Sequence, residues 1–475
     1  MAMRRPMSRS VLPPLLVVVG SALLAWLVFD PWYLNYDTRY ALIWSQDLVG
    51  GFTPEFEAPF APTPHPLWNA LATGALVFGD SADSVMVGIV LLSFGAIVWL
   101  VYALGAELFG RWAGVVAALV VLTRAAILRD AVLVYLDVTF AALIVGAVLL
   151  EVQRRRRGWP VLAVLFVAGL LRPEAWVLGL LYVAYLWRGL ERGDRVRYVA
   201  LALAAPVIWL VGDAIITGDP LHSLHGTAAL AEENERRRSL SDVPYWTLQY
   251  FGYILRLPLL IGIPVGIYLA WRRGIGRAAV PVVVAVLLVL AFAAGPVFGL
   301  PLIGRYLRTP AALLAVFYGA ACFAWLTLAP SRQRSRLALV GGACVLLSLV
   351  YAPSSADHLR DLGDRRDGES RLFVSLRDLA EAPRVQAAFA RCPEMTATDH
   401  RPVPHLRWWL DGDPGTVGTT EDDSAPQGRI VIVPRPGRVP RSWAELVDRG
   451  NARPPGYVRI HRNRAWRAFA AKECV

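Results

Sequence analysis

The stretch from Ser84 to Ala103 reads SVMVGIVLLSFGAIVWLVYA and carries no charged side chain. A helix that crosses the ~30 Å hydrocarbon core of a bilayer needs about 20 apolar residues, which is the length of this stretch. Further apolar stretches, some of them marginal, fill the chain as far as about Tyr351. We therefore predict an all-α polytopic membrane domain with about eleven spans, which start near Val11, Ser84, Trp112, Ala131, Trp159, Ala175, Tyr198, Trp246, Ala278, Pro310 and Leu337.

The composition indicates a membrane protein followed by a water-exposed part. Of the 475 residues, 56% are hydrophobic and 18% are charged, whereas about a quarter of a soluble domain is charged. The residues after about Ala352 read as ordinary soluble protein, with a helical pattern over 372–390 and a strand-like run over 429–433. We expect a membrane domain at residues 1–352 and a small C-terminal α/β domain at residues 353–475.

Arginine clusters between the apolar stretches set the predicted topology. All of them fall on one side of the membrane if the spans alternate, and the positive-inside rule makes that side cytoplasmic. The N-terminus is then cytoplasmic, and the first loop (residues 30–83) and the C-terminal domain are extracytoplasmic. High Arg and Ala usage suits a bacterial plasma membrane. The formal net charge of +11 follows from these clusters and does not indicate a nucleic-acid partner. The clusters are Arg4 to Arg9, Arg154 to Arg157, Arg188 to Arg197, Arg272 to Arg277 and Arg332 to Arg336.

The first outer loop holds several candidate acids and a histidine. Asp37 precedes an apolar-periodic stretch, so it is either the N-cap of a helix or a catalytic carboxylate. Glu55 and Glu57 follow in the same loop, and either of them is an alternative candidate for a catalytic carboxylate. His65 lies in a proline-dense segment, where a rigid structural turn is the competing interpretation.

Shorter outer turns carry further charged groups. Arg172 and Glu174 flank a proline that can start a helix, and Arg305 and Tyr306 precede the tenth span. An arginine at a membrane edge commonly reaches only to the lipid headgroups, which is the structural interpretation. Asp137 is expected one to two turns inside the fourth span, where an ionisable residue is either functional or a structural partner of an arginine. The arginines of the preceding turn are Arg124 and Arg129.

Several of these motifs together resemble the GT-C superfamily of glycosyltransferases, especially the protein O-mannosyltransferases and the lipid A aminoarabinose transferases. Asp37 with the Arg39-Tyr40 pair is similar to their acidic motif in the first outer loop, although Thr38 stands where a second acid is usual. His65-Pro66-Leu67 resembles the later element of the same loop. Similar turns in the family are Leu171-Arg172-Pro173-Glu174, Arg305-Tyr306-Leu307 and the Arg-rich turn before Asp137.

The resemblance implies a sugar transfer on the outer face of the membrane from a polyprenyl-phosphate donor to an acceptor hydroxyl. Asp37 would accept the proton of the acceptor, and His65 would orient Asp37 or the donor. The phosphate would be bound by Arg172 and Arg305, assisted by Arg124 or Arg129. The supporting residues would be Arg39, Tyr40, Glu55, Glu57, Asp137, Glu174 and Tyr306. A single displacement inverts the anomeric carbon, and because phosphate is a good leaving group we expect neither a metal nor a cofactor.

Other features leave alternatives open. His222 and His225 give only a weak metal pattern, and the loop from 217 to 245 is better interpreted as a charged interfacial helix. Cys392 and Cys474 both lie in the outer C-terminal domain and are candidates for a disulfide. The tryptophans of the C-terminal domain either contact carbohydrate or belong to an aromatic core; they are Trp408, Trp409 and Trp443.

The rival functions for the whole chain are a transporter or lipid flippase and a non-catalytic scaffold with the same fold.

Overall fold

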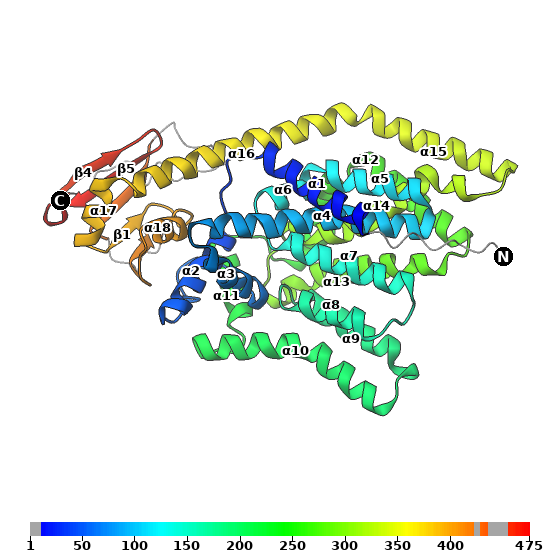
Figure 1. Ribbon diagram of the computed structural model, residues 1–475, viewed down its shortest axis with the longest axis horizontal. Helices are drawn as coiled ribbons and strands as arrows, with labels where there is room; N and C mark the ends of the chain where they lie inside the picture. The colour runs from blue at the N-terminus through cyan, green and yellow to red at the C-terminus, as the bar shows by residue number, and fades with distance from the viewer. Residues whose placement is uncertain (1–10, 422–427, 436–454) are drawn as a thin grey trace.

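The computed structural model describes residues 11–421, 428–435 and 455–475. Its helices run mostly along the long axis of the molecule, with a small sheet at one end, here called the sheet end (Figure 1). The helices that match the predicted spans are α1 (Leu12–Val28), α4 (Ala82–Phe109), α5 (Arg111–Thr123), α7 (Asp137–Gln153), α8 (Trp159–Gly169), α9 (Glu174–Leu186), α10 (Arg192–Thr217), α12 (Val243–Arg272), α13 (Ala279–Ala294), α14 (Arg308–Phe323) and α15 (Arg332–Val350).

Further elements connect these helices or follow them. The other α-helices are α2 (Tyr36–Gly50), α3 (Pro66–Ala75), α6 (Ala125–Val132), α11 (His222–Glu233), α16 (Ala352–Ala380), α17 (Pro383–Arg391) and α18 (Val403–Trp409). The strands are β1 (Met395–Ala397), β2 (Val417–Thr419), β3 (Ile430–Pro434), β4 (Tyr457–Arg462) and β5 (Trp466–Ala471). The 3₁₀ turns are η1 (Leu76–Ser81), η2 (Trp187–Gly189), η3 (Leu240–Asp242), η4 (Gly276–Ala278), η5 (Gly295–Phe298), η6 (Gly304–Leu307), η7 (Ala324–Thr327) and η9 (Lys472–Cys474).

Each predicted span therefore coincides with a helix, but the helices differ in length. Six helical segments of the described residues are long and apolar enough to cross a membrane, and a seventh is added if α6 and α7 count as one bent span. The shorter apolar helices include α1, α5 and α8. The chain is thus a polytopic, mainly helical membrane protein with a small sheet, as the sequence predicts.

The fourth span begins later than the sequence predicts. α6 ends at Val132, and α7 starts at Asp137 after a bend of 120°. Val134 has a left-handed backbone (φ 58°) in the turn between the helices, and this conformation interrupts the helix. Asp137 consequently lies at the first position of α7, not one to two turns inside it, where its negative charge is favoured by the helix dipole.

Small residues allow the central helices to pack closely. A Cβ atom on Gly319 of α14 would lie 2.1 Å from the backbone oxygen of Ala113 in α5. A Cβ atom on Gly266 of α12 would lie 1.8 Å from the backbone oxygen of Phe317 in α14. Such short separations are impossible for a real Cβ, so glycine at both positions permits backbone-to-backbone contact. α14, most of whose residues are buried, therefore lies at the centre of the bundle, and η6 directly precedes it.

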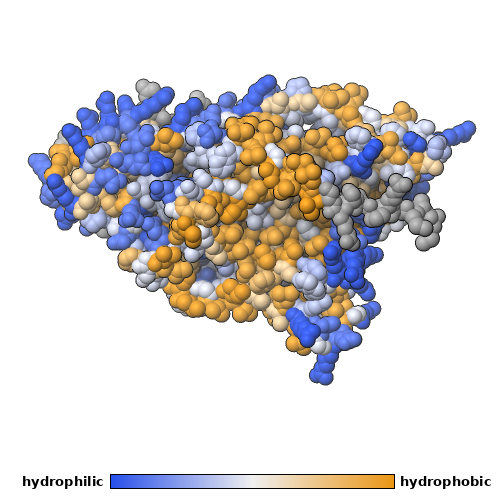
Figure 2. Space-filling view, viewed as in Figure 1, coloured by the Kyte–Doolittle hydropathy of each residue, from blue (hydrophilic) through white to orange (hydrophobic). Residues whose placement is uncertain are grey.

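Exposed apolar side chains surround the bundle. Figure 2 shows a broad hydrophobic region over its middle, with hydrophilic residues toward both ends of the long axis. On α10, for example, Val207, Val211 and Ile215 are 50–78% exposed. A soluble monomer rarely exposes a contiguous apolar surface of this extent, whereas a bilayer covers it.

The C-terminal residues form a mixed five-stranded sheet in the order β2-β1-β3-β5-β4. β1 pairs in parallel with β2 and β3, and β5 pairs antiparallel with β3 and β4. The strand-like run predicted from the sequence becomes β3, all five residues of which are buried. The predicted helical pattern becomes the end of α16 and α17, separated because Pro383 starts a new helix. The proposed boundary between residues 352 and 353 falls at the beginning of α16.

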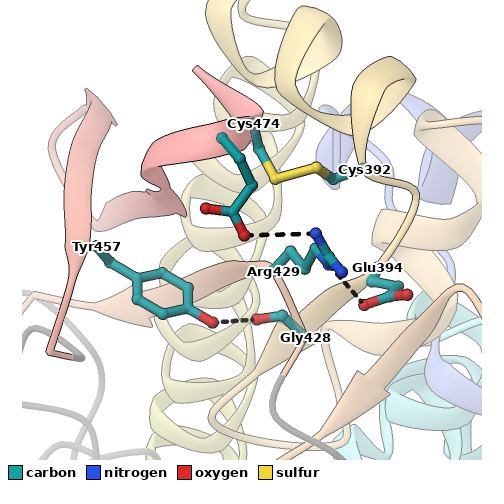
Figure 3. Close-up of a disulfide and its surroundings, with 7 residues drawn as sticks. Cys392, Glu394, Gly428, Arg429, Tyr457 and Cys474 are labelled. Carbon is teal, nitrogen blue, oxygen red and sulfur yellow. Dashed lines mark hydrogen bonds and ion pairs between the residues drawn. A yellow bond between two sulfur atoms is a disulfide. The ribbon is translucent and has the colours of Figure 1, made fainter.

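A disulfide joins Cys392 to Cys474, as the sequence suggested, and ties the chain end to the segment after α17 (Figure 3). Arg429 lies beside it, 3.6 Å from a carboxylate oxygen of Glu394 and 3.3 Å from one of Glu473. Cys322 and Cys344 are free and buried in α14 and α15, which agrees with their predicted place within spans.

Candidate functional site

Asp37 lies in the first turn of α2, at the sheet end of the bundle. The N-cap of this helix is Asn35, whose side chain accepts a hydrogen bond of 2.7 Å from the amide of Thr38. The alternative in which Asp37 serves as the N-cap is therefore wrong. Its carboxylate instead faces Arg305 of η6, with 3.2 Å between Oδ2 and Nη1.

Asp137 joins Arg305 to a second arginine. It pairs with Nη1 of Arg172 in the turn between α8 and α9, and its Oδ2 lies 3.7 Å from Nε of Arg305. Glu174 also contacts Arg172, at 2.7 Å. Burial lowers the pKa of Arg172, but Glu174 and Asp137 outweigh this effect and raise the pKa above its usual value. The result is a buried row of alternating charges in which both arginines remain charged.

Aromatic rings border this row. The guanidinium of Arg172 lies 4.0 Å from the ring centroid of Tyr306, and that of Arg305 lies 4.8 Å from the ring of Tyr135. Tyr306 was predicted from the sequence, whereas Tyr135 was not. The only sequence signal for Tyr135 is its position two residues before Asp137, in the turn that replaces the expected start of the span.

His65 is the residue before α3, and its charged neighbours are Arg172, Asp137 and Arg305. Its Nδ1 is buried and has no hydrogen-bond partner among the described residues, and its ring packs edge-on against Trp209 at 5.4 Å. Burial, reinforced by Arg172, lowers the pKa of His65 to about 3. The ring is therefore neutral near pH 7, and it can donate or accept a hydrogen bond but does not carry a charge.

The neighbours of Asp37 in the sequence have structural partners. Arg39 is buried and forms a double ion pair with Asp83, at 2.8 and 2.5 Å. Tyr40 is buried in an aromatic cluster with Tyr36 and Trp44. Arg39 and Tyr40 thus hold α2 in place and do not reach the carboxylate of Asp37. Thr38 donates a 2.7 Å hydrogen bond to the carbonyl of Val134.

The alternative acids are not placed beside Asp37. Glu55 lies 3.2 Å from Arg407 of α18, which also pairs with Asp47 of α2. Glu57 is exposed. The sequence could not show this arrangement, because Arg407 lies more than 350 residues away in the C-terminal part. Among Asp37, Glu55 and Glu57, Asp37 is therefore the acid that faces Arg305.

The two arginines predicted to assist differ in position. Arg129 is exposed at the end of α6, and its charge acts on Tyr135 and Arg308, so it lies at the edge of the Asp37 site. Arg308, which was not predicted, pairs with Asp130. The side chain of Arg124 lines a different pocket, where its charged neighbour is Arg256. The structure does not bring Arg124 to Arg172 and Arg305.

The remaining sequence candidates also receive partners. His222 and His225 lie in α11, where His222 contacts the carbonyl of Phe56 and His225 contacts Asp219, so they do not converge on one site. The rings of Trp408 and Trp409 pack against the guanidinium of Arg39, whose Cζ lies 5.1 and 5.8 Å from their centroids. This favours a role in the protein core over contact with carbohydrate. Trp443 lies outside the described residues.

One group of possible metal ligands exists among the described residues. Asp399, His400 and Glu421 offer ligand atoms within 4.8 Å of one another. These atoms already have protein partners, since His400 hydrogen-bonds Glu421 at 2.6 Å and Arg401 lies 3.5 Å from Asp399. The group does not include Asp37, Asp137 or either arginine of the site.

The geometry defines what the Asp37 site can do. A carboxylate that is 24% exposed can accept a proton from an incoming hydroxyl group. The adjacent arginines can bind a phosphate and compensate negative charge that develops on it. These groups come from α2, the turn before α9 and η6, which are far apart in the sequence.

Comparison of the sequence with protein-family models and with curated proteins gives no match. Comparison with solved structures gives several matches. ArnT from Cupriavidus metallidurans bound to undecaprenyl phosphate has a TM-score of 0.59 at 17% identity, covering 97% of this chain and 98% of that one. Its apo state has a TM-score of 0.58 at 15% identity, with the same coverage. The oligosaccharyltransferase of Archaeoglobus fulgidus, tethered with an acceptor peptide, has a TM-score of 0.50 at 14% identity, covering 86% of this chain and 64% of that one.

ArnT is a lipid A aminoarabinose transferase, and both neighbours are GT-C superfamily members. The likeness to ArnT extends over the membrane helices and the C-terminal sheet, since it covers nearly the whole of both chains. The resemblance of the sequence motifs is confirmed at the level of the fold: this chain has the GT-C fold.

Proposed function

We propose that the chain is a membrane glycosyltransferase that moves a sugar from a polyprenyl-phosphate donor to an acceptor hydroxyl. The observation that supports this most directly is the ion pair of Asp37 with Arg305, joined through Asp137 to Arg172. One site then holds a proton acceptor beside two phosphate-binding groups. The shared fold with ArnT, which was crystallised with undecaprenyl phosphate, supports the same class of donor.

The proposed reaction is a single displacement. The lipid phosphate binds to Arg172 and Arg305, which stabilise the charge that grows on it as the glycosidic bond breaks. Asp37 takes the proton of the acceptor hydroxyl as its oxygen attacks the anomeric carbon. The configuration at that carbon is inverted. Because the leaving phosphate is compensated by arginine, the chemistry does not require a metal ion.

Asp137 and Glu174 are positioning residues in this proposal. They contact Arg172, and Asp137 also lies beside Arg305, so they fix the guanidinium groups before the donor arrives. Preorganised groups of this kind need not rearrange when charge develops. The neutral His65 would orient the donor by a hydrogen bond from its ring.

The membrane orientation is also a proposal. If the arginine clusters lie in the cytoplasm, the N-terminus is cytoplasmic and the sheet end is extracytoplasmic. The Asp37 site then faces the outer side, where nucleotide sugars are absent and a lipid-linked donor is the available substrate. We propose the plasma membrane of a bacterium as the location.

The test uses the full chain in lipid, with a panel of polyprenyl-phosphate sugars and of hydroxyl acceptors. Released lipid phosphate and transferred sugar are measured for the native chain, for Asp37→Asn and for Asp357→Asn, whose carboxylate lies in an exposed pair with Arg360. We expect transfer by the native chain and Asp357→Asn, and a rate at least about 100-fold lower for Asp37→Asn. Equal rates for all three would exclude Asp37 as the base, and no transfer from any donor would contradict the proposed function.

A further inference from the structure

A second group of basic side chains lies in a small pocket between the end of α5, the start of α6, α12 and α16. Arg124, Arg256, Ser355 and His358 contribute to its lining, and no carboxylate is among the lining residues. Neither Arg124 nor Arg256 forms an ion pair with a carboxylate in the part of the chain that the structure describes. Two positive charges therefore face each other without an anion to compensate them, which is unfavourable unless a ligand supplies one.

The contacts of His358 leave this charge in place. Its Nδ1 lies 2.5 Å from the carbonyl oxygen of Ser354. The guanidinium of Arg256 lies within hydrogen-bond distance of both ring nitrogens. A histidine ring carries no negative charge, so His358 orients Arg256 but does not neutralise it. In addition, Nε of Arg124 is buried and has no acceptor within residues 11–421, 428–435 and 455–475.

The backbone of Arg256 is unusual for an arginine. Its φ of 61° and ψ of 167° interrupt α12, two residues before Pro258. Proline explains a break at this place, because it lacks an amide hydrogen and clashes with the preceding turn. It does not explain why an arginine occupies a conformation that glycine adopts at lower cost. Retaining such strain is typical of a side chain with a function.

The start of α6 adds donors to the same pocket. Ala125 and Ala126 contribute to the lining, and their amides donate no backbone hydrogen bond to any residue that the structure describes, since the first bonds of the helix come from Ile127 and Leu128. Unpaired amides at a helix N-terminus are a favourable environment for an anion. Two arginines, Ser355 and the first residues of α6 therefore border one pocket.

The pocket lies where lipid headgroups are expected. Ser355 and His358 follow the end of α15 at Val350 by one to two helical turns. On α12, Arg256 and Arg272 bracket an apolar stretch of about 24 Å at 1.5 Å per residue, close to the thickness of a hydrocarbon core. The pocket has a volume of about 20 Å³, room for about one water-sized group, so it admits an oxygen of a phosphate at its mouth but not a sugar ring.

We propose that this pocket binds the phosphate group of a membrane lipid, with the acyl or prenyl chains lying in the bilayer beside α12 and α16. Arg124 and Arg256 hold the phosphate oxygens, and the α6 amides and Ser355 complete the site. The site is separate from the Asp37 site and does not depend on the transferase reaction. It gives Arg124 a function other than the one that the sequence suggested.

The test measures the thermal unfolding of the full-length protein in neutral detergent at low salt, by tryptophan fluorescence. The probes are dihexanoyl phosphatidic acid, dihexanoylglycerol and inorganic phosphate. The variants are Arg124→Gln, Arg256→Gly and both together. Glycine fits the φ of residue 256, so it removes the charge without disturbing the backbone. Asp37→Asn and Arg336→Gln, which changes an exposed arginine of α15, are the controls.

We expect phosphatidic acid, but not dihexanoylglycerol, to raise the unfolding temperature of the native chain and of both controls. The concentration needed should increase at least tenfold in each single variant, and the effect should disappear in the double variant. An unchanged response of the double variant would overturn the proposal, as would no response of the native chain. An equal response to inorganic phosphate would replace the lipid by free phosphate as the ligand.

Discussion

Oδ2 of Asp37 lies 3.2 Å from Nη1 of Arg305, although 268 residues separate them in the sequence. The side chains are 24% and 22% exposed, so the pair is open enough for a ligand to reach and dry enough for its charges to interact strongly. In the proposed reaction Asp37 acts on the acceptor hydroxyl and Arg305 acts on the leaving phosphate, and they therefore contribute to one transition state.

A double-mutant cycle tests this relationship. Asp37→Asn and Arg305→Gln should each lower the rate of sugar transfer by about 100-fold or more. The double variant should be less impaired than the product of the two effects, because residues that act as a unit are not additive. Transfer rates of the four proteins under saturating donor provide the measurement. Multiplicative effects would mean that the two residues act independently.

Replacing Asp137 by asparagine should destabilise the protein. The carboxylate is buried between Arg172 and Arg305, and its loss leaves the buried guanidinium of Arg172 and the partly buried one of Arg305 with less compensation. Breaking a buried pair in this way costs roughly 3–5 kcal/mol. Asp357→Asn is the matched control, since its pair with Arg360 is exposed and contributes less than about 1 kcal/mol. Unfolding in denaturant should show this difference, and equal midpoints would contradict the buried network.

The lowered pKa of His65 in the folded protein predicts that the stability depends on pH. Burial lowers its pKa to about 3 in the folded protein, while the unfolded chain has a value of about 6.5. As the pH falls, the unfolded state therefore binds the proton before the folded state does. The contribution of the neutral His65 to the free energy of unfolding is complete above pH 6.5 and is lost as the pH falls from 6.5 toward 3. The slope is on the order of 1.4 kcal/mol per pH unit. His65→Gln should lack this component, and parallel stability curves for the two proteins between pH 4 and 7 would disprove it.

Removing the disulfide should loosen the C-terminal sheet. Cys392 and Cys474 close a segment with a sequence separation of 82, and losing a bridge of a small domain typically costs about 2–5 kcal/mol. In the double variant with serine at both positions, β5 and the end of α17 should exchange their amide hydrogens faster, whereas the membrane helices should not. Replacing the free Cys344 by serine is the control for altered thiol content.

Arg407 should control how α18 docks on the first loop. It contacts Asp47 and Glu55, and both carboxylates lose their partner in Arg407→Gln. Burial already raises the pKa of Asp47 to about 6, and Arg407 opposes this effect, so the variant should raise the pKa further. Faster hydrogen exchange in α2 and α18 near pH 7 is the expected result. The exposed Arg384→Gln serves as the comparison and should leave the exchange unchanged.

The sequence located most of the candidate site but misjudged some of its partners. Asp37, Arg172 and Arg305 are candidates because they lie in predicted outer loops and resemble GT-C motifs, and Asp137 is one because an ionisable residue inside a span is costly. Arg124 was grouped with them because it shares a turn with Arg129. The bend of 120° between α6 and α7 and the left-handed Val134 could not be inferred from hydrophobicity, and they decide which side chains of this region meet.

The sequence by itself determined the order of the apolar helices, the small C-terminal α/β part and the polar character of the turns. The reason is that the apolar length needed to cross a bilayer is a local property of the chain. Only the tertiary structure decided which charges form pairs: Asp37 with Arg305, Asp137 between two arginines, and Glu55 with Arg407. Ion pairs depend on distances of a few ångströms between segments hundreds of residues apart, and these distances are fixed by helix packing at positions such as Gly266 and Gly319.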